Sequence, residues 1–488
     1  MTLQKIRTKS TGHLTSLERD SFANLVDQSN SNFRVKAGSV VDVSLEALDP
    51  GAIVYNEADG KMYFCDDEWW NPAGVPIKLK VVYTDTQFAF KFKAPSTSTL
   101  NIYDGDGTLT AVAWNDATLV THTTSYATPG TYYFYVEGDY VDLTWLEARQ
   151  QSFVSGDVSR FSELTNLTKL MVDDSSVSGD ISEWGALTSL TDLRVMWSSV
   201  TGDITGWNTL VNLITLNVQG TALTGDVSGF YTMSSCTSFR VYRTSVTFDS
   251  VQTWVAPTYA GPAIGNSLML ADCGMTASMV DNMIQSFVGL QNIFISIGGT
   301  NGSRTAASNT ALATILTRNI LITVNESAPV GSLGPELHTD ANAMSDPNSN
   351  EANATMGWTP AGLTGTGSNV FESQGAVKDT GSYALHGNAN DTPTSGAGFS
   401  KTFTVDASSL YQLKFKWRHV GVGLDWGCYM DGSFRGINLW ETYLTFREET
   451  IYFPSTDTSY IVSFREGNAS NSGGCYTDNL SLKKVTLP

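Results

Sequence analysis

Four consecutive segments decide the fold of this chain: SGDVSRFSELTNLTKLMVDDSSV at 155–177, SGDISEWGALTSLTDLRVMWSSV at 178–200, TGDITGWNTLVNLITLNVQGTAL at 201–223 and TGDVSGFYTMSSCTSFRVYRTSV at 224–246. Each is 23 residues long, no residue separates one from the next, and their apolar residues recur at the same positions. A single unit of this size cannot cover its own apolar face, whereas stacked units share one core. The sequence therefore predicts a stack with equivalent side chains 23 residues apart.

The spacing L-x-x-L-x-V-x-x-S/T-x-V-x-G-D resembles the leucine-rich repeat. That resemblance implies one short strand per unit (193–197, for example), then a turn and a helical or 3₁₀ return. Where that family has Asn, this chain has a hydroxyl residue, which can still bond a neighbouring backbone group: Ser175, Ser198, Thr221 and Thr244. Apolar echoes of the pattern after residue 246 extend the expected repeat region, with irregular spacing, over 151–326.

Two further columns of the repeat have both a functional and a structural interpretation. The acidic column is Asp157, Asp180, Asp203 and Asp226, and the aromatic column is Phe161, Trp184, Trp207 and Phe230. The carboxylates could bind cations, but we expect each to cap the helical turn that follows it. The rings could form a sugar platform, but their inward position favours a core spine.

The positions between the core columns vary from unit to unit: Lys169, Met171, Asp173, Arg194, Met196, Trp197, Asn217, Gln219, Arg240, Tyr242 and Arg243. We expect them on the exposed side of the strands. A varied surface that carries Trp, Tyr and Arg has the composition of a recognition face, although an ordinary solvated surface is an equal alternative. From this set, Arg194, Trp197, Arg240 and Tyr242 are candidate ligand-binding residues.

Residues 82–150 are predicted to form a β-sandwich, because alternating runs such as 88–93 and 132–136 are bounded by Gly and Pro. The DGDGT turn at 104–108, with His122, Tyr126 and a PGTY segment at 129–132, resembles PKD-like sandwiches that precede leucine-rich repeats in Bacteroidota surface proteins. The Trp of that family's turn is missing here. Turn chemistry is the expected role of Asp104 and Asp106, since the other ligands of a calcium loop are missing.

Residues 1–81 contain an amphipathic segment at 14–26 with helical spacing and a strand, turn and strand pattern at 51–74 that ends in paired aromatics. The second pattern resembles small hairpins in phage fibres and in structural proteins of Bacteroidota-associated phages. That resemblance implies a region through which the chain contacts other virion proteins.

Residues 327–488 are predicted to form a linker followed by a strand-rich domain. The segments GWTPAG (357–362), TGSYALHGN (380–388) and CYTDNLSLKKV (475–485) resemble carbohydrate-binding-module-like jelly rolls. That resemblance implies stacking rings for a sugar ligand, at Trp417, Trp426, Tyr429, Trp440 and Tyr443. It also implies a possible structural calcium at Asp478, in the closing strand. No other cofactor is expected.

The composition restricts the functional class. A chain of 488 residues predicts several domains, and its abundant Gly and aromatic residues favour a mainly β multidomain protein. With 29 Lys and Arg against 48 Asp and Glu, the net charge of −19 argues against nucleic-acid binding. There is no apolar run long enough to span a membrane, so no membrane insertion is expected.

No H-E-x-x-H or G-x-S-x-G motif is present, and we expect no catalytic residues. Because no export signal is recognisable, the favoured function is a bacteriophage virion fibre or spike protein, made in the host cytoplasm, that binds a host-surface glycan or protein receptor. Such a protein is expected to be a homo-oligomer. A secreted or surface glycan-binding protein of a Bacteroidota bacterium is the alternative, and a glycan depolymerase is the third.

Overall fold

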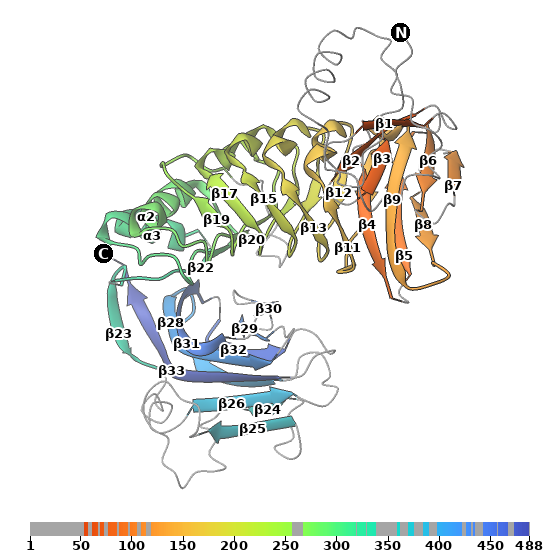
Figure 1. Ribbon diagram of the computed structural model, residues 1–488. Helices are drawn as coiled ribbons and strands as arrows, with labels where there is room; N and C mark the ends of the chain where they lie inside the picture. The colour runs from red at the N-terminus through yellow and green to blue at the C-terminus, as the bar shows by residue number, and fades with distance from the viewer. Residues whose placement is uncertain are drawn as a thin grey trace, which may run out of the picture.

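The computed structural model is mainly β and describes most of the chain beyond residue 52 (Figure 1). The described residues are 53–56, 61–66, 69–72, 77–84, 87–95, 98–104, 109–113, 119–255, 267–318, 320–327, 329–337, 359–361, 369–374, 384–389, 398–421, 426–430, 433–434, 443–455, 457–466 and 473–487. The predicted amphipathic segment at 14–26 lies outside them. Within them, no helix is long and apolar enough to cross a membrane.

The regular repeats form the predicted parallel ladder. It consists of β12 (Lys169–Met171), β14 (Asp192–Arg194), β16 (Thr215–Asn217) and β18 (Ser238–Arg240), paired in that order. Leu170, Leu193, Leu216 and Phe239 stand side by side across the ladder. The next column, Val172, Val195, Val218 and Val241, has no exposed surface. The 23-residue column prediction is confirmed.

Each unit also contributes a second strand, where the sequence predicted only a turn. These strands are β13 (Ser176–Asp180), β15 (Ser199–Asp203), β17 (Ala222–Asp226) and β19 (Ser245–Thr247), and they form a second parallel ladder. The physical reason is a short alternation. Val177, Val200, Leu223 and Val246 are buried while both of their neighbours are exposed or half-buried, which is the pattern of a half-buried strand.

The aromatic column lies on short 3₁₀ helices and is a core spine, as predicted. The helices are η4 (Ser159–Glu163), η5 (Ser182–Ala186), η6 (Thr205–Thr209) and η7 (Ser228–Thr232). The Trp184 ring is nearly parallel to the rings of Phe161 and Trp207, with centroids 6.3 and 6.4 Å away. The indole N–H groups of Trp184 and Trp207 each donate to a backbone carbonyl of the preceding repeat. Both indoles are therefore buried with their hydrogen-bond donors satisfied.

The acidic and hydroxyl columns both stabilise turns. Asp157, Asp180, Asp203 and Asp226 each accept the backbone N–H of the residue two positions later, at 2.8 to 2.9 Å, which confirms the expected cap. Ser175, Ser198, Thr221 and Thr244 each donate their hydroxyl to the carbonyl three residues earlier, at 2.6 to 2.7 Å.

After residue 246 the ladder continues through longer, irregular units, which confirms the predicted echoes. The strands are β20 (Ser267–Met269), β21 (Phe294–Ser296) and β22 (Leu321–Thr323). The returns now include α2 (Ala277–Ser286), η8 (Phe287–Gly289), η9 (Ala306–Ser308) and α3 (Asn309–Leu316). These helices cover the far end of the repeats (Figure 1).

The N-terminal β-sandwich is continuous with the repeats. Its strands are β4 (Lys78–Tyr83), β5 (Phe88–Lys93), β6 (Thr99–Tyr103), β7 (Leu109–Ala113), β8 (Val120–Thr124) and β9 (Gly130–Gly138). After η3 (Tyr140–Asp142), β10 (Trp145–Glu147) joins β5 to β12, and β11 (Val154–Asp157) joins β4 to β13. One apolar core runs through both parts. The predicted boundary at 81/82 falls inside β4.

The predicted N-terminal hairpin pattern is a three-stranded antiparallel sheet of β1 (Ile53–Asn56), β2 (Lys61–Asp66) and β3 (Trp69–Pro72). In the sandwich, Asp104 is buried and bonded within its own domain. Its carboxylate lies 2.7 Å from Nε2 of His122 and accepts the Thr124 hydroxyl, and its backbone carbonyl accepts the Tyr126 hydroxyl. These contacts agree with the structural role expected for Asp104.

The C-terminal domain is a β-sandwich whose first sheet extends the repeat ladder. That sheet contains β23 (Ser332–Glu336), β25 (Asn369–Gln374), β26 (Ala384–Ala389), β28 (Leu410–Gly421), β31 (Tyr443–Pro454) and β33 (Gly473–Thr486). The second sheet contains β24 (Thr359–Ala361), β27 (Gly398–Thr404), β29 (Trp426–Met430), β30 (Ser433–Phe434) and β32 (Ser459–Glu466). Because β31 pairs with β22, one long sheet runs from the N-terminal sandwich through the repeats into this domain.

Candidate functional site: a cleft between the repeats and strand β31

One residue of each repeat adopts a left-handed backbone conformation at the same edge of the long sheet. The residues are Gln150, Asp174, Trp197, Gly220, Arg243, Asp272 and Gly299, with φ between 53° and 73°. Each lies two positions after the last inward-facing residue of its strand. A positive φ is unfavourable for a bulky side chain such as Trp197, and such conformations often mark functional sites. We call this set the left-handed column.

The Trp197 ring lies over Gly220, its neighbour in the left-handed column. A side chain at Gly220 would collide with the ring, so glycine at this position makes room for it. On the other side of Gly220, the guanidinium carbon of Arg243 is 5.8 Å from the centre of the Trp197 ring, within the range of a cation–π contact. The indole is therefore held between Gly220 and Arg243 and remains partly exposed.

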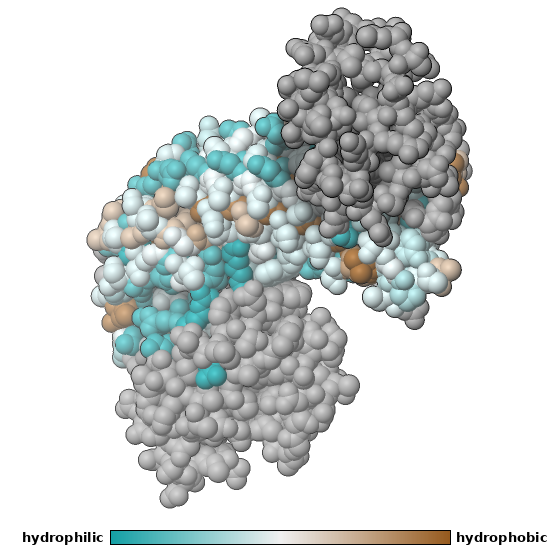
Figure 2. Space-filling model, viewed as in Figure 1, coloured by the Kyte–Doolittle hydropathy of each residue, from teal (hydrophilic) through white to brown (hydrophobic). Residues whose placement is uncertain are grey.

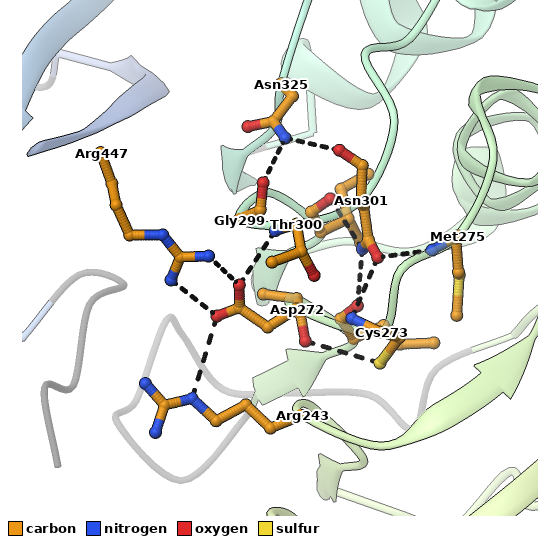
Figure 3. Close-up of polar contacts among 12 residues, drawn as sticks. Arg243, Asp272, Cys273, Met275, Gly299, Thr300, Asn301, Asn325 and Arg447 are labelled. Atoms are coloured by element: carbon orange, nitrogen blue, oxygen red, sulfur yellow. Dashed lines mark hydrogen bonds and ion pairs between the residues drawn. The ribbon is translucent and has the colours of Figure 1, made fainter. Parts of the chain in front are cut away.

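Asp272, the next residue of the column, connects the repeats to the C-terminal domain (Figure 3). Its Oδ1 accepts a hydrogen bond from the Thr300 backbone N–H at 2.9 Å. The same oxygen accepts a second hydrogen bond from Nη2 of Arg447, on β31, at 2.5 Å. Nη1 of Arg447 donates to Oδ2 at 3.4 Å, and Nε of Arg243 lies 4.0 Å from the same oxygen. One carboxylate thus orients two guanidinium groups that come from different domains.

These side chains line an open cleft of about 620 Å³. Trp197, Arg243, Asp272 and Arg447 line it together with hydroxyl residues such as Thr221 and Thr300. The side chains of Arg243, Asp272 and Arg447 are 12%, 16% and 18% exposed, so most of their surface is buried. Such partial burial strengthens their hydrogen bonds relative to those of fully exposed groups.

Two asparagines fix the backbone behind Asp272 (Figure 3). Oδ1 of Asn301 accepts the N–H groups of Cys273 and Met275, and its amide donates to the carbonyls of Leu270 and Ile297. The Asn325 amide donates to the carbonyls of Gly299 and Asn301 at 2.7 Å. Sequence reasoning missed this role of Asn301, because Asn301 lies one position after the hydroxyl column of the regular repeats, whose equivalent residue here is Thr300.

Glu449 lies behind Arg447 on the same face of β31 and is 7% exposed. Its Oε2 occupies the space beside Gly298, where an added Cβ would stand only 3.3 Å away. Burial, and secondly the negative charge of Asp272, raise the pKa of Glu449 to about 8. The positive charge of Arg447 lowers the pKa of Glu449 but does not outweigh these two causes, so Glu449 is predominantly uncharged at neutral pH.

The four repeat residues predicted to bind ligand fall into different environments. Trp197 lies in the cleft. Arg194 makes a bidentate pair with Asp192, at 2.9 and 3.0 Å. Arg240 is half-buried on the outward face of β18. Tyr242 is only 5% exposed and belongs to the core of the C-terminal domain, which corrects its assignment as an exposed ligand-binding ring.

The predicted aromatic site of the C-terminal domain is only partly described. Trp417 is 2% exposed and packs in that domain's core, so its assignment as a ligand-binding ring is corrected. Trp426 and Tyr429 are in β29, Tyr443 is in β31, and their side chains lie outside the described residues, as does the whole of Trp440. The Asp478 side chain also lies outside them. Among the described residues, no group of three or more His, Cys, Asp or Glu side chains is placed to hold a metal ion, and calcium at Asp478 stays a prediction.

No protein-family model matches the sequence, and no curated protein is similar to it. Solved structures give partial likenesses of fold. The BIR2 ectodomain from Arabidopsis thaliana is 20% identical with a TM-score of 0.19, and the match covers 21% of this chain and 55% of that one. The LRR ectodomain of the receptor kinase SOBIR1, from the same plant, is 16% identical with a TM-score of 0.20, covering 22% and 59%.

The CBM22-1 xylan-binding domain of Paenibacillus barcinonensis Xyn10C is 14% identical with a TM-score of 0.24, and the match covers 33% of this chain and 100% of that domain. The chain thus spans little more than half of the two leucine-rich-repeat ectodomains. The fold class is the mainly β, multidomain one predicted, with repeats followed by a C-terminal β-sandwich.

Proposed function

We propose that the protein is a recognition protein that binds a glycan in the cleft between the left-handed column and β31. The observation that carries this proposal is the Trp197 ring, which packs against Gly220 in a cleft that Arg243, Asp272 and Arg447 also line.

This combination of groups suits a sugar. The C–H face of a pyranose packs on an aromatic plane, and fixed polar groups select the orientation of its hydroxyls. Here the guanidinium groups are donors, and the carboxylate and threonine oxygens are acceptors. Because Asp272 and the backbone behind it hold these groups in place, little side-chain entropy is lost on binding.

Binding without cleavage is part of the proposal. A glycosidase of the usual type needs two carboxyl groups that flank the bond to be cleaved. Among the described residues that line the cleft, Asp272 is the single carboxylate, so the second carboxyl group of such a pair is missing there. Glu449, whose raised pKa would suit a general acid, is buried behind Arg447 and is not a lining residue.

The cellular setting that we propose is a phage virion, where the protein would act as a fibre or spike that binds a receptor on the host surface. The hairpin resemblance at 51–74 supports this setting, and residues N-terminal to β4 would contact other virion proteins. Removal of residues 1–76, which leaves β4 intact, should then abolish incorporation into particles. A secreted bacterial glycan-binding protein remains the second candidate, and neighbouring glycan-utilisation genes instead of capsid genes would favour it.

The binding proposal is tested with the full chain on a glycan array. Trp197→Ala should abolish retention of every glycan that the wild type binds, while the melting temperature changes by less than a few degrees, because the ring is at a surface edge. Tyr231, an aromatic residue 42% exposed and outside the cleft lining, provides the matched control. Tyr231→Ala should retain binding. Unchanged retention by Trp197→Ala would overturn the proposal.

A further inference from the structure

The outward face of the long sheet, next to the cleft, carries polar atoms that have no hydrogen-bond partner in the part of the chain that the structure describes. Arg240 on β18 stands beside Asn217 of β16 and Met269 of β20. Figure 2 shows hydrophilic residues gathered on the lower side of the repeats, toward the C-terminal domain. Met269 and Tyr242 belong to the core of that domain, so Arg240 lies where the domain's apolar core meets the open polar face.

Three buried atoms of this patch lack a hydrogen-bond partner among the described residues: Nε of Arg240, Oε1 of Gln219 and Oγ of Ser267. Gln219 is 3% exposed and Ser267 is 4% exposed. Ser267 lies on the adjacent strand β20, two residues before Met269, and Gln219 lies two residues beyond Asn217, past the end of β16, so the two residues lie on opposite sides of Arg240 along the strand direction. Buried polar groups are nearly always satisfied, and each exception requires an explanation.

Arg240 also lacks a neutralising carboxylate among the described residues. Arg194, a cation on the same face of the ladder, is already paired with Asp192. Burial, and to a smaller extent the positive charge of Arg194, lower the pKa of Arg240, whereas Tyr242 acts to raise it. A half-buried cation whose Nε is buried is destabilising without a counter-charge, which another molecule could supply.

We infer that Arg240, with Gln219 and Ser267 beside it, binds the anionic group of an acidic glycan, a carboxylate or a sulfate ester. This inference rests on the proposed function and adds the ligand's charge. An arginine fork matches the two oxygens of either group, and Ser267 supplies a further donor. Oε1 of Gln219 can accept a hydroxyl of the same sugar. The neutral part of the glycan then continues toward Trp197.

The test uses the full chain and isothermal titration with four probes: an oligogalacturonate and its fully methyl-esterified neutral form, and a sulfated dextran oligosaccharide and its unsulfated form. The two pairs distinguish a carboxylate from a sulfate. The wild type should bind one of the acidic probes at least about tenfold more tightly than its neutral form, and 0.5 M NaCl, roughly three times physiological ionic strength, should weaken that binding.

Arg240→Met is the decisive variant, because its two expected effects have opposite signs. Binding of the acidic probe should fall by about tenfold to a hundredfold, whereas the melting temperature of the unliganded protein should rise, since a half-buried cation without a counter-charge among the described residues has been removed. Arg194→Met is the control. It breaks an existing ion pair, so it should not raise the melting temperature, and it should affect binding less than Arg240→Met.

Each other outcome is decisive as well. If Arg240→Met lowers the melting temperature, Arg240 is structural and the inference is wrong. If the melting temperature rises but acidic and neutral probes bind alike, water satisfies these atoms and the inference is also wrong. In both cases the proposed function stands provided that Trp197→Ala still abolishes glycan retention on the array. It fails separately if Trp197→Ala has no effect there.

Discussion

The two sides of the parallel ladder β12–β14–β16–β18 differ in how regularly their residue types repeat from unit to unit. On the inward side apolar residues recur at the same positions in every unit, and Leu193 and Val195 are buried like their equivalents. On the outward side and at the edge, equivalent positions hold Asp174, Trp197, Gly220 and Arg243. Stacking requires identical shapes between units, whereas recognition requires a specific set of different groups. Periodicity therefore identifies the scaffold, and departures from it identify the candidate site.

The largest expected effect comes from the inward side. Leu193→Ala should lower the free energy of unfolding by about 2–5 kcal/mol, because it leaves a cavity in a column where no side chain can move to fill it. The outward neighbour on the same strand is the control: Arg194→Ala removes a partly exposed ion pair and should cost less than about 1 kcal/mol. Equal losses in chemical denaturation would contradict the difference between the two sides.

A second effect concerns Glu449, where the sheet passes from the repeats into the C-terminal domain. Its pKa is raised from 4.5 to about 8, so the folded state holds its proton more tightly than the unfolded state. The stability from this group is complete below pH 4.5, falls as pH rises to about 8, and is constant above that. The loss should be on the order of a few kcal/mol.

Glu449→Gln has no proton to lose, so its stability should remain flat across the window in which the wild type declines. Glu163→Gln is the matched control, because Glu163 is an exposed partner of Arg160 and its charge is screened by solvent. Denaturant unfolding at pH 5, 7 and 9 measures the difference. A parallel decline in the wild type and in Glu449→Gln would show that Glu449 does not titrate in this way.

The smallest effect is at the sheet edge. Gly220→Ala places a side chain at φ 68° and against the Trp197 ring, so it should cost about 1–2 kcal/mol and reduce glycan binding by displacing the ring. Gly206→Ala is the control, since an added Cβ there meets no atom within 4 Å. It should change stability by less than about 1 kcal/mol. Full glycan binding by Gly220→Ala would indicate that the ring position does not matter.

Much of the scaffold was predictable because its signal is periodic and local. The core columns, the aromatic spine and the Asp caps follow from the 23-residue spacing alone. The second strand of each unit was missed because the Gly-Asp that ends it suggested a turn. The burial of Trp417 had a signal that was overlooked: Tyr411, Leu413, Phe415 and Trp417 alternate along β28, and all four are in the core.

The site was predictable only in part, because it depends on contacts between distant segments. Trp197 was identified by its residue type on a variable face. No spacing could bring Arg447 to Asp272, which is 175 residues away in the sequence, since that pair depends on how the C-terminal domain docks on the repeats. The same docking buries Tyr242, whose own repeat gives no sign of it. The left-handed column was missed because Trp, Gly, Arg and Asp share no residue-type signal.

A crystal structure of the full chain with the glycan that it retains most strongly on the array tests the central claim most directly. The account predicts a sugar ring packed on Trp197, with its polar groups within hydrogen-bond distance of Arg243, Asp272 or Arg447. A ligand bound only at the aromatic residues of β29 and β31, with the cleft unoccupied, would contradict it.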